Sequence, residues 1–110
     1  MTTKPLVPRA LALEDVEAAL DYYLGEAGAE AATGFVDELR AVYAPIARNP
    51  GSGSPRYAHE LDIAGLRSWP MKRYPYLIFY FEQSGHVEVW RVLHGKRDIP
   101  AWLPDPPTQR

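Results

Sequence analysis

The stretch from Tyr76 to Leu93, YLIFYFEQSGHVEVWRVL, decides the fold of this 110-residue chain. Its first part, Tyr76–Glu82, is aromatic and aliphatic up to Phe81, a composition that favours a β-strand. Gln83–Gly85 is short enough for a hairpin turn, and His86–Leu93 follows as the returning strand. We therefore predict an antiparallel β-hairpin whose first strand lies in the middle of a sheet.

One further strand precedes this hairpin. Leu66–Met71 has strand character, and Pro70 marks an edge or a bulge because proline cannot donate a backbone hydrogen bond. Residues 66–94 then form a three-stranded antiparallel meander. Residues 49–55, NPGSGSP, have the composition of a loop and are too few for a linker between domains.

The N-terminal half predicts two helices within residues 13–49. Apolar side chains recur there at helical spacing, and Gly28 is placed to stop the first helix and link an antiparallel helical hairpin. Glu14, Asp15 and Glu17 fall in the expected first turn, where the helix dipole favours anions. The two apolar stripes comprise Leu13, Val16, Leu20, Tyr23, Leu24 and Ala27, and then Ala32, Phe35, Val36, Leu39, Val42, Tyr43 and Ile46.

Two short elements flank these parts. Residues 4–9 hold two prolines and form at best an edge strand. Residues 98–103 are expected to form one helical turn, with Asp98 as the N-cap and Pro100 near the first helical position. The order of elements predicts an α+β, two-layer fold, in which the helical hairpin packs on a three- to four-stranded antiparallel sheet.

Length and composition limit the class of protein. The chain weighs 12.4 kDa, is 46% hydrophobic and 24% charged, and is expected to form a single domain over residues 1–110. It has no cysteine, and its three histidines lie far apart in sequence, so we expect no disulfide, metal or cofactor. No apolar run approaches the roughly 20 residues of a membrane helix and no signal peptide begins the chain, which favours the cytoplasm.

Charge and aromatic content differ between the halves. Residues 1–55 carry four basic and eight acidic side chains, whereas residues 56–110 carry eight basic and six acidic ones. A basic, aromatic second half favours a surface for an acidic partner, although the same residues also suit a core with a solvated rim.

The strand Tyr76–Phe81 is apolar at every position, so both of its faces need cover. Tyr76, Ile78 and Tyr80 form one row that the helical hairpin is not expected to cover, with Trp90 and Val92 beside it. This surplus of apolar surface predicts a protein partner or self-association.

Two segments carry a family resemblance. The run 66–81, LRSWPMKRYPYLIFYF, and the ending 89–98, VWRVLHGKRD, resemble the RelE/ParE superfamily of type II toxins, and more narrowly ParE, also known as plasmid stabilisation proteins. The similarity extends to DVEAALDYY at residues 15–23 and GSGSPR at residues 51–56, and so spans nearly the whole chain.

The resemblance implies a small bacterial cytoplasmic toxin that inhibits DNA gyrase by binding and is neutralised by a cognate ParD-like antitoxin. That antitoxin has a ribbon-helix-helix DNA-binding part, through which the hetero-oligomeric complex binds operator DNA, and a tail that folds on the toxin. Two alternatives stay open: a ribosome-dependent mRNA endonuclease of the RelE type, and a degenerate, non-toxic protein that retains antitoxin binding.

The antitoxin tail is expected on the helical hairpin and the sheet. Arg91 lies among apolar residues of the last strand and needs a partner, for which Glu82, Glu88 or an antitoxin carboxylate are candidates. The predicted antitoxin-binding residues are Leu20, Tyr23, Leu24, Phe35, Leu39, Tyr76, Ile78, Tyr80, Trp90 and Arg91.

Ribonuclease chemistry would need a base or an orienting group for the 2′-hydroxyl and cations for the phosphorane charge. The candidates are His94, Arg91 and Arg97. They do not form a complete acid–base set, and His94 also suits a packing role at the strand end, so we predict a binder rather than an enzyme.

The target is expected to contact the cations of the second half and one aromatic residue. Trp69 is a possible interface anchor, although core packing suits it equally, and the cations beside it also suit a solvated strand edge. The predicted target-binding residues are Arg67, Trp69, Lys72, Arg73, Lys96 and Arg97.

Overall fold

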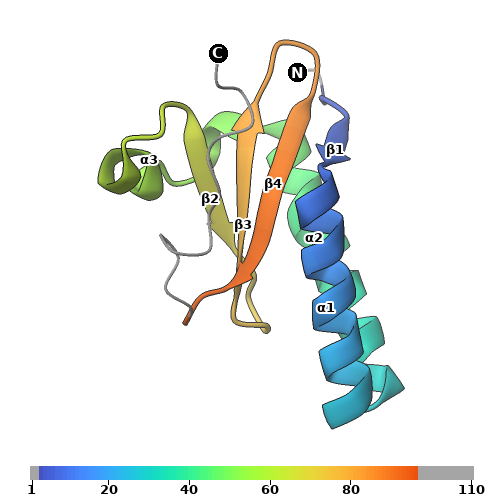
Figure 1. Ribbon diagram of the computed structural model, residues 1–110. Helices are drawn as coiled ribbons and strands as arrows, with labels where there is room; N and C mark the ends of the chain where they lie inside the picture. Colours follow the sequence, from blue (N-terminus) through green and yellow to red (C-terminus); the bar gives the residue numbers. More distant parts are fainter. Residues whose placement is uncertain (1–2, 97–110) are drawn as a thin grey trace.

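The computed structural model describes residues 3–96 and places two long helices against one face of a sheet (Figure 1). The predicted α+β class and the packing of the helical hairpin on the sheet are confirmed. The predicted turn at 98–103 and Arg97 lie outside the described residues. The elements in chain order are β1 (Leu6–Pro8), α1 (Ala10–Glu26), α2 (Ala29–Arg48), η1 (Pro50–Ser52), α3 (Arg56–Leu61), β2 (Leu66–Pro70), β3 (Tyr76–Glu82) and β4 (Val87–His94).

The sheet has the strand order β1-β4-β3-β2. The last three strands form the predicted antiparallel meander. β1 pairs parallel to β4, with the Val87 N–H donating to the Pro5 carbonyl and the Arg9 N–H to the Val89 carbonyl, each at 2.9 Å. The sheet is therefore mixed, and the expectation of a wholly antiparallel sheet is wrong. A strand of three residues has too short a pattern to reveal its direction.

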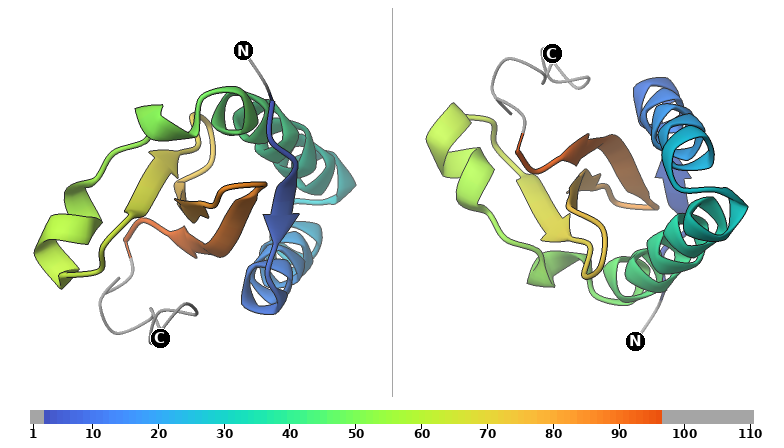
Figure 2. Two further views of the ribbon diagram at one scale, coloured as in Figure 1. Left: turned by 90° about the horizontal axis from the view of Figure 1, so that it is seen from above. Right: turned by 90° about the horizontal axis from the view of Figure 1, so that it is seen from below.

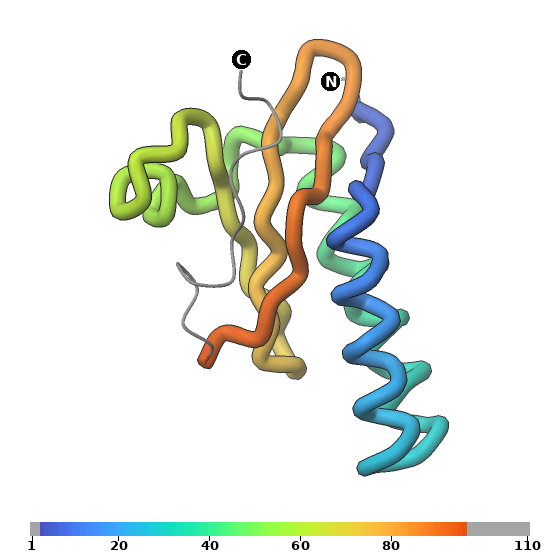
Figure 3. Tube along the Cα trace, in the orientation of Figure 1, coloured from blue at the N-terminus to red at the C-terminus, as the bar shows by residue number. Residues whose placement is uncertain are grey.

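The two turns of the meander lie at opposite ends of the sheet (Figure 3). The β3–β4 turn lies beside the start of β1, where the Lys4 Nζ donates to Glu82 Oε2 at 2.9 Å. The β2–β3 loop, residues 71–75, lies at the other end, close to the end of β4. There the Gly95 N–H donates to the Pro75 carbonyl at 2.7 Å.

α1 begins at Ala10, earlier than the sequence pattern predicts. The first-turn role expected for Glu14, Asp15 and Glu17 is therefore wrong, because no acidic residue lies in that turn. The helix ends at Glu26, and Gly28 lies in the connection to α2 as predicted, with a φ of 94° that suits glycine.

The main core fills the space between the hairpin and the sheet. The row Tyr76, Ile78 and Tyr80 faces this core, and Ile78 and Tyr80 have no exposed surface. The prediction that the hairpin leaves this row uncovered is wrong, because Phe35 and Leu39 of α2 pack in the same cluster. Its buried members are Ala12, Ala19, Phe35, Leu39, Val42, Ile46, Met71, Ile78, Tyr80, Val87, Val89 and Val92.

A second, smaller core lies on the opposite face of the sheet. Leu66, Phe79, Phe81, Trp90 and Leu93 are buried there. Figure 2 shows the sheet between the hairpin on one side and α3 on the other. Tyr57 of α3 meets Phe79 edge-on, with the ring centroids 5.2 Å apart. α3 was not predicted from the sequence, because it has only six residues and no side-chain cap.

Across residues 3–96, none of the helices combines the length and the apolar character that crossing a membrane requires.

Candidate partner-binding site

Arg91 is buried and forms a two-pronged ion pair with Asp15 of α1. Its Nε donates to Asp15 Oδ2 at 2.7 Å and its Nη2 to Oδ1 at 2.8 Å. Asp15 Oδ2 also accepts the Val92 N–H at 3.0 Å. The hydrogen bond to Asp15 raises the pKa of the Arg91 guanidinium further, against the opposing effect of burial. The pair fastens α1 to β4.

The partner of Arg91 corrects the sequence analysis, which named Glu82, Glu88 or an antitoxin carboxylate. Glu82 pairs with Lys4, and Glu88 pairs with Arg9, each at 2.9 Å. Asp15 was missed because it was expected in the first turn of its helix. The early start of α1 instead places it opposite β4.

A β-bulge directs Arg91 toward the helix. Phe79 is paired with Arg91 and Tyr80 with Val89, so Trp90 is the additional residue in β4. Val89 and Val92 consequently both face the helix-side core, while Trp90 lies in the opposite one. A bulge of this kind re-aims side chains. Strict alternation along the sequence does not reveal it, which explains why Trp90 was wrongly placed beside the Tyr76 row.

His94 lies at the end of β4 on the helix side. Its ring meets Tyr76 edge-on, with the centroids 5.3 Å apart, and its Nδ1 accepts the Lys96 N–H at 3.1 Å. Together with Asp15, Tyr22 and other residues it lines a cavity of about 510 Å³ between α1 and the ends of β3 and β4. Arg91 and His94 thus both lie toward α1, but Arg91 is held by Asp15.

An aromatic cluster lies near the connection between α1 and α2, at the closed end of the helical hairpin. Tyr23 stacks on Phe35 with the ring centroids 5.8 Å apart and meets Tyr74 edge-on at 5.1 Å. Phe35 also meets Tyr76 edge-on at 5.3 Å. Burial, followed by the neighbouring Tyr76, raises the pKa of Tyr23 to about 12, so this phenol remains neutral at physiological pH.

The predicted antitoxin-binding residues divide by exposure. Six of them lie in the protein's own interior, covered by its own side chains, and their role in binding an antitoxin stays a prediction. Leu20, Tyr23 and Tyr76 are half-buried, and Leu24 is 53% exposed. The six interior residues are Phe35, Leu39, Ile78, Tyr80, Trp90 and Arg91.

The exposed large apolar side chains concentrate on α1. Leu11, Leu13, Tyr22 and Leu24 belong to this helix. Leu24 was predicted to bind the antitoxin, but the other three residues were not. The available signal was that Leu11 and Tyr22 fall outside the single apolar stripe that a half-buried helix requires.

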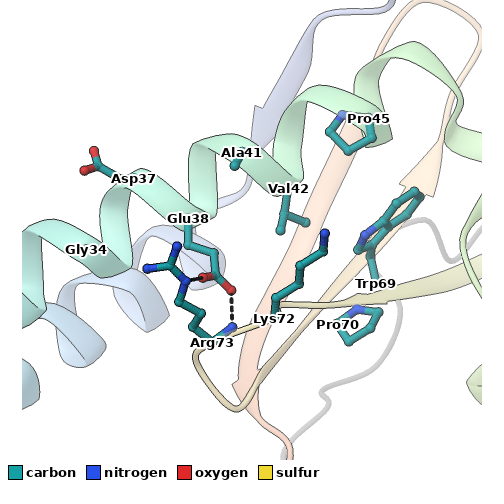
Figure 4. A pocket seen from close by; sticks show the side chains of 10 residues that line it. All are labelled: Gly34, Asp37, Glu38, Ala41, Val42, Pro45, Trp69, Pro70, Lys72 and Arg73. Atoms are coloured by element: carbon teal, nitrogen blue, oxygen red, sulfur yellow. Dashed lines mark hydrogen bonds and ion pairs between the residues drawn. The ribbon is translucent and has the colours of Figure 1, made fainter.

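Three of the predicted target-binding residues, Trp69, Lys72 and Arg73, line a groove between α2 and β2 (Figure 4). The groove has a volume of about 530 Å³ and is lined by Trp69, Pro70, Lys72 and Arg73 from β2 and the loop after it. The wall formed by α2 consists of Gly34, Asp37, Glu38, Ala41, Val42 and Pro45.

Arg67 and Lys96 do not line this groove. The Arg67 Nη1 donates to the Gly53 carbonyl at 2.7 Å, so it supports the loop before α3. Lys96 is exposed beyond β4. Trp69 is half-buried against the main core and also lines the groove, so it packs in the core as one interpretation expected, and its role as an interface anchor stays a prediction.

Comparisons with known proteins identify the family and agree with the fold. Residues 6–99 match the family described as "ParE toxin of type II toxin-antitoxin system, parDE". A solved structure of a chromosomal ParDE TA system from P. aeruginosa has the same fold, with a TM-score of 0.70 and 21% sequence identity over 84% of this chain and 96% of that one. No curated protein matches the chain. Because the family match spans most of its length, the chain belongs to the ParE toxin family of type II toxin–antitoxin systems.

Proposed function

We propose that this ParE-family toxin acts by binding DNA gyrase rather than by cleaving RNA, and that a ParD-like antitoxin neutralises it. The antitoxin would carry a ribbon-helix-helix part, through which the hetero-oligomeric complex binds operator DNA. The site of action would be the cytoplasm.

The ion pair of Arg91 carries the proposal of a binding mechanism. A ribonuclease of the RelE kind needs a cation to stabilise the charge that develops on the phosphorane. Arg91 is the buried cation of the last strand, and two of its nitrogens donate to Asp15. Presenting this guanidinium to a phosphate would break the contact between α1 and β4.

The environment of His94 supports the same mechanism. The Nδ1 of His94 accepts a backbone N–H and its ring packs on Tyr76. The imidazole therefore has a structural role in fixing the end of β4. If the chain were a ribosome-dependent mRNA endonuclease, His94 would be its base, because this residue lines the cavity beside α1.

The exposed apolar residues of α1 support an antitoxin surface on this helix. Leu13, Tyr22 and Leu24 are each more than half exposed. A disordered tail that folds on a partner needs apolar surface of this kind to offset its ordering entropy. We propose that the antitoxin tail covers α1, in place of the buried row on β3.

The test separates the two mechanisms in purified components. Inhibition of gyrase supercoiling by the wild-type protein, with ribosome-bound mRNA left intact, is the expected result. Cuts in ribosome-bound mRNA together with unaffected gyrase would establish the endonuclease instead. Failure of both assays, with antitoxin binding retained, would identify the degenerate, non-toxic protein.

A further inference from the structure

The loop between β2 and β3, residues 71–75, is tied to α2. The Arg73 N–H donates to Glu38 Oε2 at 2.6 Å, and the Tyr74 hydroxyl donates to the Ala31 carbonyl at 2.8 Å. The loop is also closed on itself, because the Met71 N–H donates to the Tyr76 carbonyl at 2.9 Å. Its backbone is therefore fixed before any partner arrives.

Gly34 makes room for this attachment. A Cβ atom at position 34 would lie 2.5 Å from the Tyr74 hydroxyl. Glycine inside a helix is unfavourable relative to alanine. Its presence in the second turn of α2 lets the Tyr74 hydroxyl reach the Ala31 carbonyl at the helix backbone.

The fixed loop presents two cations at the groove. Within residues 3–96, Lys72 forms no hydrogen bond or ion pair. The Arg73 side chain is 88% exposed, and its Nε lies 4.0 Å from Glu38 Oε1. In Figure 4 the Lys72 side chain rises between Val42 and Trp69, so its ammonium group lies next to apolar surface.

This chemistry favours an acidic segment of a protein over nucleic acid. The groove is lined with Val42, Pro45 and Trp69, which suit an apolar side chain. Asp37 and Glu38 line its α2 wall, where the closely spaced charges of a phosphate backbone would meet them, whereas a peptide can place one carboxylate at the loop cations and an apolar side chain against the rest of the groove. A protein segment with a carboxylate beside an apolar side chain can pair with the loop cations and pack its apolar group in the groove.

Strand addition at β2 is blocked, which determines how the segment would bind. The Ser68 N–H and carbonyl both bond to Ser54, at 2.9 Å each. Pro70 has no N–H, and the Leu66 N–H donates to the Ile63 carbonyl at 3.3 Å. A partner must therefore be recognised here through side chains in the groove.

We propose that the α2–β2 groove and loop 71–75 form a preformed docking surface for an acidic segment of the target protein, and that Glu38 and Tyr74 are the positioning residues that preform it. The inference rests on the proposed function in one respect, namely that the target is gyrase protein rather than the DNA that gyrase holds.

The positioning role is tested without any partner. Amide hydrogen exchange of the full chain should show faster exchange at Arg73, by about tenfold or more, in Glu38→Ala. Glu38→Gln keeps an acceptor oxygen and should restore protection to within about twofold. Glu30→Ala, an exposed acid on the same helix, is the matched control and should change nothing. Unchanged exchange at Arg73 in Glu38→Ala would overturn the positioning role.

The docking surface is tested by binding to purified gyrase holoenzyme without DNA. Lys72→Ala/Arg73→Ala should weaken binding by about tenfold or more, and Glu38→Ala by less, with Glu38→Gln close to wild type. The control Arg40→Ala/Arg48→Ala removes two other exposed cations and should bind as wild type does. Unchanged affinity in the loop variant, or wild-type binding that requires DNA, would overturn the proposal.

Growth inhibition by the same variants separates this proposal from the choice of target. If wild type is toxic but does not bind gyrase, the gyrase assignment fails. The groove would still be the target surface if Lys72→Ala/Arg73→Ala alone loses toxicity. Full toxicity of that variant overturns the groove as well.

Discussion

The exposed face of α1 and the α2–β2 groove are opposite in character. α1 has five acidic residues and no basic one, and Leu13, Tyr22 and Leu24 project from it. The groove is bordered by Lys72 and Arg73 on a loop that is tied to α2. The first surface offers apolar area, whereas the second offers charges in fixed positions.

This difference implies two kinds of association on one small scaffold. Burial of apolar surface on α1 should depend little on salt. Contacts to exposed cations on the loop should weaken as ionic strength rises, because screening acts on exposed charges. The two surfaces should therefore be separable by mutation and by salt.

The largest effect is expected where α1 is fastened to the sheet. Asp15→Ala leaves the buried Arg91 without this carboxylate and should lower the free energy of unfolding by about 3 kcal/mol. Urea denaturation measures this loss. Adding Arg91→Met to Asp15→Ala should recover part of it, and equal stability of the Asp15→Ala and wild-type proteins would show that the pair does not hold α1.

The α1 surface itself is tested by Leu13→Asp/Leu24→Asp. Both side chains are more than half exposed, so stability should change by less than about 0.5 kcal/mol per site. Affinity for the cognate antitoxin should fall by at least about thirtyfold, close to 2 kcal/mol. Calorimetric titration of both proteins decides the matter, and unchanged affinity would place the antitoxin elsewhere.

A smaller loss of stability is expected at Gly53, which lies against Tyr80. A Cβ atom there would overlap the Tyr80 hydroxyl and ring, and that buried hydroxyl donates to the Pro50 carbonyl at 2.6 Å. Gly53→Ala should lower the free energy of unfolding by about 1.5 kcal/mol, because the Tyr80 side chain that fills this space must move. Gly51→Ala is the control, since open space surrounds its Cβ position; equal unfolding midpoints would contradict the packing.

Alkaline pH should reveal the same tyrosine. Burial raises the pKa of Tyr80 from 10.0 to about 12. The unfolded phenol therefore loses its proton first, and stability falls as pH rises from 10 toward 12. Tyr80→Phe should show a shallower decline over this window in urea denaturation. Parallel pH profiles for the two proteins would contradict this role.

The smallest effect is expected at His94. If toxicity arises from docking, His94→Ala should keep its dose–response curve within about twofold of wild type. A general base would contribute a factor of about 10² to 10⁴. An inert His94→Ala protein that still folds and binds antitoxin would favour the endonuclease.

Much of the fold was predictable because long periodic segments carry their own signal. β3 spans Tyr76–Glu82 as predicted, and Gly28 lies in the connection between α1 and α2. What escaped prediction depends on tertiary contacts. The direction of β1, the bulge at Trp90 and the partner of Arg91 each arise where distant segments meet.

The candidate site was predictable only in part. The cations Lys72 and Arg73 stand out in the sequence and line a groove in the structure. Glu38, which holds their loop, lies 35 positions before Arg73 and gives no local signal. The error over Ile78 and Tyr80 came from assigning the wrong sheet face to the hairpin.

The central claim is that α1 and the groove serve different partners, and one paired measurement tests it most directly. Leu13→Asp/Leu24→Asp and Lys72→Ala/Arg73→Ala are expressed with and without the cognate antitoxin, and growth is recorded against inducer dose. The account predicts that the α1 variant stays toxic and escapes the antitoxin, whereas the loop variant loses toxicity and still binds the antitoxin when purified. Loss of both properties in either folded variant would contradict it.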